Sequence, residues 1–305
     1  MNNKLQALFI VFALFASAFY ANAQSDVKTT EIWLVDMSSK DGQFTFGPPV
    51  KITDNTYYDN QPCFSDDGRF VYFVSMPDTP QTDIFEYDTK TKFTRRITNT
   101  PESEYQPQPI IGKKRLLSVV RVDEEKAQGF YSVNMDGTEI LNISENSDSI
   151  AYYAWLNDST VGMYVLDGDF PMLLQFEMPI QQSIVITEGG SFGRCLQKIP
   201  GSADLSYVDK NDKKNWLLYN FSFEKEDTLF ICKMIEGEED YCWAPGRYIF
   251  MGSKGKLFMY DPEMHNKASW KMVADFTKTI GNFYRIACSP TGNRLAIVSY
   301  SGTKP

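Results

Sequence analysis

The chain has few of the residues on which many enzymes depend. Its 305 residues include a single histidine, His265, within the polar stretch 261–266, which reads as an exposed turn. One imidazole forms neither a histidine-rich metal site nor a Ser-His pair. Two fragments that resemble calcium loops, at 167–169 and 209–212, lack the later bidentate glutamate. The sequence therefore predicts no metal, no cofactor and no catalytic residue, which weighs against hydrolases and histidine-dependent lyases.

A cluster of basic residues is also missing. The 30 Lys and Arg residues are outnumbered by 39 Asp and Glu residues, which gives a formal net charge of −9. Nucleic acids and anionic membrane surfaces both require positive charge at the contact. Neither is an expected partner.

A long apolar run is present only at the N-terminus. Lys4 precedes the apolar residues 5–20, and Ala21-Asn22-Ala23 follows. The small residues at 21 and 23 match the pattern that signal peptidase cleaves, and the run is shorter than the roughly 20 residues of a membrane span. We expect residues 1–23 to be a signal peptide. Residues 24–305 are then a single domain without a membrane span, either periplasmic or secreted.

The five cysteines are odd in number and have no C-x-x-C spacing. Four of them fall on expected inner strands, where small buried hydrophobic residues are needed. Buried thiols are favoured, although one bridge between neighbouring repeats stays open. The cysteines are Cys63, Cys195, Cys232, Cys242 and Cys288.

The stretch 59–76 sets the pattern for the rest of the chain. A short apolar strand leads into the turn Ser65-Asp66-Asp67-Gly68, and a longer alternating strand follows at 70–75. Ser and Asp side chains bond nearby backbone N–H groups in such turns, and glycine tolerates positive φ. Two further strands, at 83–88 and 94–98, complete about 43 residues, the size of one four-stranded propeller blade.

The same strand rhythm continues to the end of the chain. Four more sets of four strands follow, and a last set stops after two strands, at 284–288 and 295–299. Two unpaired strands at the start, Glu31–Met37 and Val50–Thr53, make up that deficit. No stretch has a sustained helical period. The prediction is an all-β, six-bladed β-propeller of four-stranded antiparallel blades, closed by N-terminal strands that complete the last blade.

The first repeat resembles a known family. Asp59-x-x-Pro62-x-Phe64-Ser65-Asp66-Asp67-Gly68, followed by Asp83-Ile84-Phe85-x-Tyr87-Asp88, is similar to the WD40-like (PD40) repeat of TolB-like six-bladed propellers. Cys288-Ser289-Pro290-Thr291-Gly292 repeats part of it. The resemblance implies a propeller fold and a bacterial envelope setting. It extends only to the propeller part: the N-terminal domain of TolB has no counterpart here, and the chain is too short to hold the hydrolase domain of the related peptidases.

The loops that lead into the inner strands are rich in aromatic and charged residues. In a propeller these loops meet at one mouth of the central channel, and such rings offer stacking faces with polar rims, which suit a peptide or a sugar. Packing within the repeat is the alternative for each ring. The predicted mouth residues are Tyr58, Asp59, Glu104, Tyr105, Tyr153, Arg194, Asp240, Tyr241, Tyr284 and Arg285.

These observations favour a non-catalytic, exported propeller that binds a protein segment or an envelope component at its channel mouth. One alternative is a carbohydrate-active enzyme, a glycan hydrolase or lyase, that uses carboxylates such as Asp59, Glu104 or Asp240. Another is a structural spacer that makes contact through the blade rims, at residues such as Arg95 or Lys271.

Overall fold

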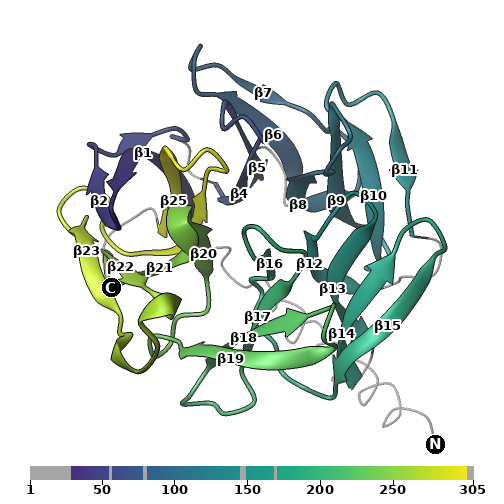
Figure 1. Cartoon of the computed structure of the whole chain (residues 1–305). Helices are drawn as coiled ribbons and strands as arrows, with labels where there is room; N and C mark the ends of the chain where they lie inside the picture. The colour runs from purple at the N-terminus through teal and green to yellow at the C-terminus, as the bar shows by residue number, and fades with distance from the viewer. Residues whose placement is uncertain (1–28, 55–56, 78–80, 145–148, 168–169, 301–305) are drawn as a thin grey trace, which may run out of the picture.

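The computed structural model describes residues 29–54, 57–77, 81–144, 149–167 and 170–300. Six antiparallel sheets surround a central axis, each sheet forming one blade (Figure 1). Helix is limited among these residues to two 3-10 turns, η1 (Pro245–Arg247) and η2 (Pro262–Lys267). This confirms the predicted six-bladed, all-β propeller. The predicted signal peptide, residues 1–23, lies outside the described residues.

Each of blades 1 to 5 is a simple up-and-down meander of four strands. Blade 1 has β4 (Asp59–Phe64), β5 (Phe70–Ser75), β6 (Asp83–Asp88) and β7 (Thr94–Arg96). Blade 2 has β8 (Ser103–Pro109), β9 (Leu116–Val122), β10 (Gln128–Asn134) and β11 (Ile140–Asn142). Blade 3 has β12 (Ile150–Trp155), β13 (Thr160–Asp167), β14 (Phe170–Glu177) and β15 (Gln182–Glu188). Blade 4 has β16 (Gln197–Lys198), β17 (Leu205–Asp209), β18 (Leu217–Ser222) and β19 (Asp227–Lys233). Blade 5 has β20 (Tyr241–Ala244), β21 (Tyr248–Ser253), β22 (Lys256–Tyr260) and β23 (Lys271–Asp275).

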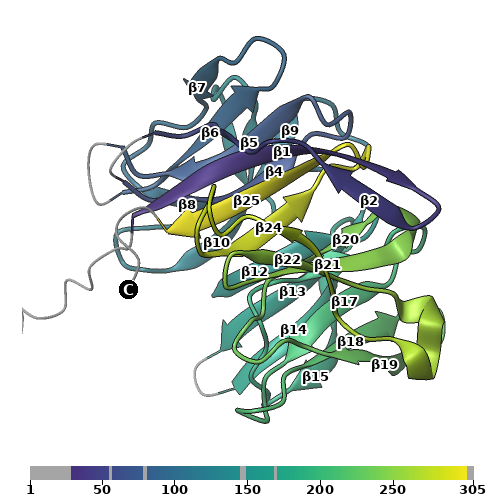
Figure 2. The same cartoon turned by 90° about the vertical axis from the view of Figure 1, so that its left-hand side faces the viewer.

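Blade 6 combines strands from the two ends of the described chain. Its inner strands are β24 (Phe283–Cys288) and β25 (Arg294–Tyr300), and β1 (Thr30–Lys40) pairs antiparallel with β25 (Figure 2). The outer positions are taken by β2 (Gln43–Phe46) and β3 (Val50–Lys51), which both pair with β1. The predicted closure is confirmed, and β2 is an addition that the sequence did not indicate.

The turn that defines the repeat has the same geometry in blades 1 and 6. The Gly68 N–H donates to Ser65 O at 2.8 Å, and the Gly292 N–H donates to Ser289 O at 2.8 Å. Both glycines have φ of 69°, a conformation that side chains with a Cβ rarely adopt. In blade 1 the Ser65 hydroxyl also donates to Asp67 at 2.6 Å. The Ser-x-x-Gly pattern therefore fixes the inner hairpin.

The hydrophobic core consists of six clusters, one at each junction between neighbouring blades. Alternation along a strand supplies both sides of a blade. In β5, Val71 and Phe73 pack toward blade 6, whereas Tyr72 and Val74 pack toward blade 2. Each blade is thus held by its neighbours, and the ring leaves a channel along the axis.

Candidate binding site at the channel mouth

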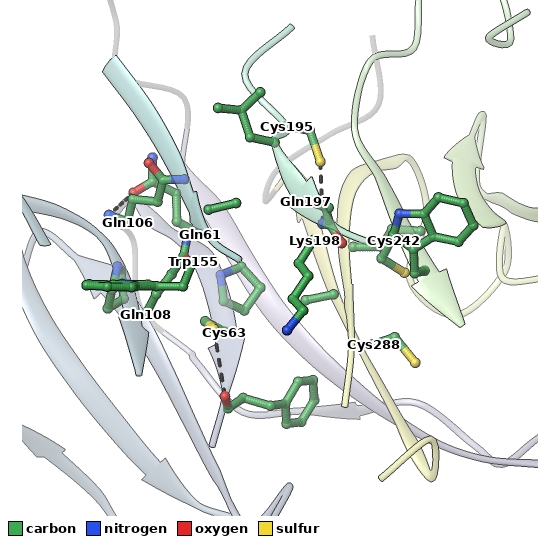
Figure 3. Close-up of a pocket in the computed structure, with 18 of the residues that line it drawn as sticks. Gln61, Cys63, Gln106, Gln108, Trp155, Cys195, Gln197, Lys198, Cys242 and Cys288 are labelled. Atoms are coloured by element: carbon green, nitrogen blue, oxygen red, sulfur yellow. Dashed lines mark hydrogen bonds between the residues drawn. The ribbon is translucent and has the colours of Figure 1, made fainter. Parts of the chain in front are cut away.

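A cavity of about 350 Å³ follows the central channel. The inner strands of all six blades line it, and Figure 3 shows the Lys198 side chain extending into it. Four of the five cysteines lie along its wall as free thiols, and burial raises the pKa of Cys63, Cys195 and Cys288 to about 12. At neutral pH these thiols are protonated, because the thiolate is disfavoured in such surroundings. The fourth thiol is Cys242.

A second cavity, of about 220 Å³, forms the mouth of the channel. Four tyrosines from blades 1, 3 and 6 surround it, together with two arginines. Arg194 and Arg285 line both this mouth cavity and the channel cavity, so these two side chains form the neck between them. The tyrosines are Tyr58, Tyr152, Tyr284 and Tyr300.

A third cavity, of about 830 Å³, is a groove over blade 2. The turn between β9 and β10 forms part of its wall, and the Tyr105 side chain also lines the groove. Gln61 and Tyr152 line all three cavities. The groove, the mouth cavity and the channel cavity are therefore neighbours, and these two side chains border all three.

The neck is held by one buried carboxylate between two arginines. Asp240 accepts hydrogen bonds from Arg194 Nη2 at 2.6 Å and from Arg285 Nε at 3.3 Å. Arg285 also donates from Nη1 to Asn60 Oδ1 at 2.9 Å. Side-chain exposure is 3% for Asp240, 13% for Arg285 and 34% for Arg194. Asp240 is thus a support beneath the arginines, and Arg194 faces the open cavity.

The charges in the neck keep each other ionised. Burial alone would raise the pKa of Asp240, but Arg285 and Arg194 outweigh it and hold that pKa below its ordinary value. Burial would likewise lower the pKa of both arginines, whereas Asp240 holds it above the ordinary value. The group therefore stays charged across the physiological pH range.

Three tyrosines of the mouth are neutral, so their hydroxyl groups are available as hydrogen-bond donors. Burial raises the pKa of Tyr58, Tyr152 and Tyr284, even though Arg285 acts in the opposite direction on all three. Arg194 lies over the Tyr284 ring at 5.2 Å from its centroid, within cation–π range. Phenol groups, ring faces and guanidinium groups thus converge in one small space.

Six of the ten predicted mouth residues lie around these cavities. Tyr58, Arg194, Tyr284 and Arg285 line the mouth cavity, and Tyr105 lines the groove. Asp240 lines the channel cavity and lies beneath the neck. The other four predicted residues, described next, are buried.

Tyr153 and Tyr241 are core residues, so neither ring offers a face to a ligand. The Tyr241 hydroxyl donates to Ser206 Oγ at 2.8 Å, and the Trp243 indole N–H donates to the same oxygen at 2.9 Å. Tyr153 repeats this arrangement at the junction of blades 2 and 3, with its hydroxyl 2.9 Å from Ser118 Oγ. A buried hydroxyl requires a hydrogen-bond partner, and here each partner lies on the preceding blade. These tyrosines therefore hold neighbouring blades together.

Asp59 and Glu104 are fully buried at the starts of β4 and β8. Glu104 Oε1 accepts from the Thr100 hydroxyl at 2.5 Å and lies 3.5 Å from Arg121 Nε. Burial, and to a smaller extent the nearby Asp83, raises the pKa of Glu104 to about 7. Neither carboxylate reaches the mouth cavity.

Sequence reasoning missed five mouth residues, namely Thr30, Asn60, Gln61, Tyr152 and Tyr300. A signal for Gln61 does exist, because Gln-Pro recurs at the same place in blade 2 as Gln106-Pro107. Both glutamines have positive φ, 52° and 53°, and both lie at a β-bulge. Bulges and such strained residues are frequent next to functional sites. The Gln61 side chain accepts from Gln106 N at 2.7 Å and so links the two bulges.

The single histidine and the acidic fragments lie away from the mouth. His265 is an exposed residue of η2, as predicted. In the fragment 209–212, Asp209 accepts from Asn211 N at 2.7 Å, which is a local turn; residues 168 and 169 of the other fragment lie outside the described residues. Within the described part of the chain, no group of three or more His, Cys, Asp or Glu side chains is arranged to hold a metal ion. Nor is any helix of that part long and apolar enough to cross a membrane.

The likeness of the fold to solved structures agrees with the repeat pattern. A putative TolB from Agrobacterium tumefaciens is 10% identical, with a TM-score of 0.68 over 90% of this chain and 99% of that one. The chain has a TolB-like propeller fold. No protein-family model and no curated protein sequence matches it.

Other solved structures share the TolB-like propeller fold. A chain of a nidogen/laminin complex is 9% identical, with a TM-score of 0.61 over 90% of this chain and 100% of that one. An oligogalacturonate lyase from Vibrio parahaemolyticus is 11% identical, with a TM-score of 0.55 over 91% of this chain and 98% of that one. At these identities the likeness concerns the fold alone, and function depends on the site.

Proposed function

We propose that this protein is a non-catalytic, exported propeller that binds an extended polypeptide segment across its channel mouth. The observation that carries the proposal is the meeting of three cavities at Gln61 and Tyr152. Neighbouring in this way, they offer a row of three hollows from the rim of blade 2 to the neck. An extended chain fits such a surface better than a compact small molecule, which is usually enclosed in a single pocket.

The lining of this surface suits a polypeptide. Tyrosine and arginine are enriched at the centres of protein interfaces, because each combines a large contact area with directional hydrogen bonds. Here they are Tyr58, Tyr152, Tyr284, Arg194 and Arg285. The nidogen/laminin neighbour supports the proposal only by analogy of fold.

The N-terminal sequence supports the proposal that the protein is exported. Residues 1–23 have the charge, apolar run and small-residue site of a signal peptide. The proposal places the protein in the periplasm or outside the cell, with a protein of the bacterial envelope as its partner. N-terminal sequencing of the exported protein, with Gln24 as the expected first residue, checks this part.

A carbohydrate-active enzyme is the alternative that the lyase neighbour keeps open. It requires a carboxylate that touches the sugar. Asp59 and Glu104 are fully buried, and Asp240 is paired with two arginines. A Gly-x-Ser-x-Gly pattern also exists at 189–193, but it lies in the loop between β15 and β16 and not at a strand-to-helix turn. These features favour binding over catalysis.

Site-specific crosslinking tests the proposal against both alternatives. A photo-crosslinking amino acid replaces Tyr105 in the groove or, as the matched control, Phe93 on the rim of blade 1, which is exposed. We expect one envelope protein to crosslink at position 105 and not at position 93. Crosslinks at position 93 or at Lys271 alone would indicate the spacer. Turnover of a glycan that a single carboxylate-to-amide change abolishes would establish the enzyme.

A further inference from the structure

The neck carries more positive than negative charge. Arg194 and Arg285 share one carboxylate, Asp240. Glu239 lies 3.4 Å from Arg194, but it also pairs with Lys210 at 2.9 Å. These five side chains therefore have a surplus of one positive charge, in a protein whose formal net charge is −9. A site of this kind attracts an anion against the overall field of the molecule.

The arginines also have hydrogen-bond donors to spare. Arg194 uses Nε and Nη2, and Arg285 uses Nε and Nη1, in contacts with the described residues. Arg194 Nη1 and Arg285 Nη2 have no hydrogen-bond partner among those residues. The Tyr58, Tyr152 and Tyr284 rings line the same cavity, so phenol donors surround the spare N–H groups. Neither of these two groups is sealed in the core, because both arginines line the open cavity, so a bound acceptor can reach the spare N–H groups.

We propose that the neck formed by Arg194 and Arg285 binds a carboxylate of the polypeptide segment, either its C-terminal carboxylate or an Asp or Glu side chain. The inference rests on the proposed function and gives the segment its chemistry. A carboxylate matches the surplus of one charge, and its two oxygens accept the paired N–H groups of guanidinium. A phosphate monoester carries nearly two charges at neutral pH and leaves one of them unbalanced.

The groove over blade 2 has the opposite charge and so directs the carboxylate to the neck. Asp123 and Glu124 line it against one lysine, Lys126, and the third acid of the lining, Glu102, is paired with Arg121. An acidic group laid in the groove is repelled, whereas the neck attracts it. The segment is therefore oriented, with its carboxylate at the channel and its less acidic part over blade 2.

The first step of the test selects a peptide without assuming its sequence. The full mature protein is incubated with a synthetic pool of random short peptides that have free C-termini, and the retained peptides are identified by mass spectrometry. The tightest peptide is then made in three forms: unmodified, amidated at the C-terminus, and with each Asp and Glu replaced by Asn and Gln. Fluorescence anisotropy gives Kd for each form.

We expect one of the two neutralised forms to bind about tenfold or more weakly, the size of effect that loss of a charge-assisted hydrogen bond produces. Loss on amidation identifies the C-terminal carboxylate, and loss on Asp/Glu replacement identifies a side chain. The same neutralisation should cost little in Arg194→Gln, which removes one side of the neck. Lys271→Gln, which removes one charge from the exposed strand β23, should keep the full loss.

Three results would contradict the proposal. Equal Kd values for all three forms with the wild-type protein would show that no carboxylate is bound, while the proposed function stands. Tighter binding of a phosphorylated version of the peptide would show that the neck prefers a phosphate group to a carboxylate. Selection of no peptide at all would remove the proposed function, and this inference with it. Because the ligand is altered as well as the protein, the outcome does not depend on whether Arg194→Gln folds.

Discussion

In the folded protein, burial disfavours the ionised form of the Glu104 carboxyl group. Glu104 is fully buried at the start of β8, and burial raises the pKa of its carboxyl group to about 7, from an ordinary value of 4.5. The folded protein therefore holds this proton more tightly than the unfolded chain does. Its contribution to stability is greatest at low pH and falls as the pH rises from about 4.5 to about 7.

Glu104→Gln should remove this pH dependence. Relative to the wild type, the variant is expected to gain about 2 to 3 kcal/mol in free energy of unfolding between pH 5 and pH 8, because the amide never ionises. Urea unfolding at the two pH values measures the gain. Asp54→Asn, at an exposed position, is the control and should show no such gain. An equal difference between wild type and Glu104→Gln at both pH values would contradict the assignment.

Among the mouth residues, a shift of one position along the strand decides whether a side chain lines the cavity or lies in the core. Successive residues of a strand point to opposite faces. Tyr152 lines the mouth cavity and Tyr153 is in the core, although the sequence offers two adjacent tyrosines. Likewise, Asp240 lines the channel cavity and its neighbour Tyr241 lies in the core. Sequence reasoning named Tyr153, whereas the structure places its neighbour Tyr152 at the mouth cavity, because the start of each inner strand cannot be placed to within one residue from the sequence.

At the scale of strands, neighbouring blades are joined by a shared serine hydroxyl. Ser206 on β17 accepts from Tyr241 and Trp243 on β20 and donates to Gln197 O at 3.0 Å. Ser118 on β9 has the same role toward Tyr153 and Trp155 on β12. The repeated Tyr-x-Trp of the inner strand is thus a blade-to-blade clamp.

Ser206→Ala should destabilise the protein by about 2 to 4 kcal/mol, because it leaves a buried phenol and a buried indole N–H without their acceptor. Equilibrium urea unfolding followed by circular dichroism measures the change. Ser38→Ala provides the comparison, since Ser38 bonds Thr45 at an exposed position, and should cost less than about 0.5 kcal/mol. A cost for Ser206→Ala as small as this would mean that the clamp is not a stabilising contact.

The strands themselves were largely predictable, with two instructive departures. β2 was missed because Gln43-Phe44-Thr45-Phe46 gains its partners from elsewhere: Phe44 packs on Phe250 of blade 5 with ring centroids 4.8 Å apart. The strand rhythm of the sequence predicts the inner strand of blade 4 at 194–197, whereas β16 is only Gln197–Lys198. There the Arg194 side chain bonds Asp240 and the Cys195 thiol bonds Tyr241 O. Tertiary contacts overrode the local pattern in both places.

At the scale of the whole molecule, stability is shared around the ring. Blade 1 packs against blade 6 through Ile32, Phe64 and Val298, and every other junction has a cluster of the same kind. No blade has a core of its own, so blades should unfold together. This closed arrangement was predictable because the two surplus strands at the start match the two that are missing at the end.

Ile32→Ala should therefore lower the stability of the entire ring. Ile32 lies on β1 and is fully buried, and loss of its side chain is expected to cost about 2 to 5 kcal/mol. Five tryptophans, in blades 3 to 6, report on distant parts of the molecule. We expect tryptophan fluorescence and circular dichroism to shift to the same lower urea midpoint. Val50→Ala, at an exposed site, is the control, and separate midpoints for the two probes would contradict shared stability.

The pairing of β1 with β25 also constrains how the protein is synthesised. Asp36 and Arg294 are partners across that pair and lie 258 residues apart. At roughly 5 to 20 residues per second, the ribosome needs about 13 to 50 s to add the residues between them. During that interval β1 has left the exit tunnel without the strand that covers it, and its apolar face is open to the solvent. The ring therefore closes only after the last blade has been made, and until then the edge of β1 that pairs with β25 has no partner strand.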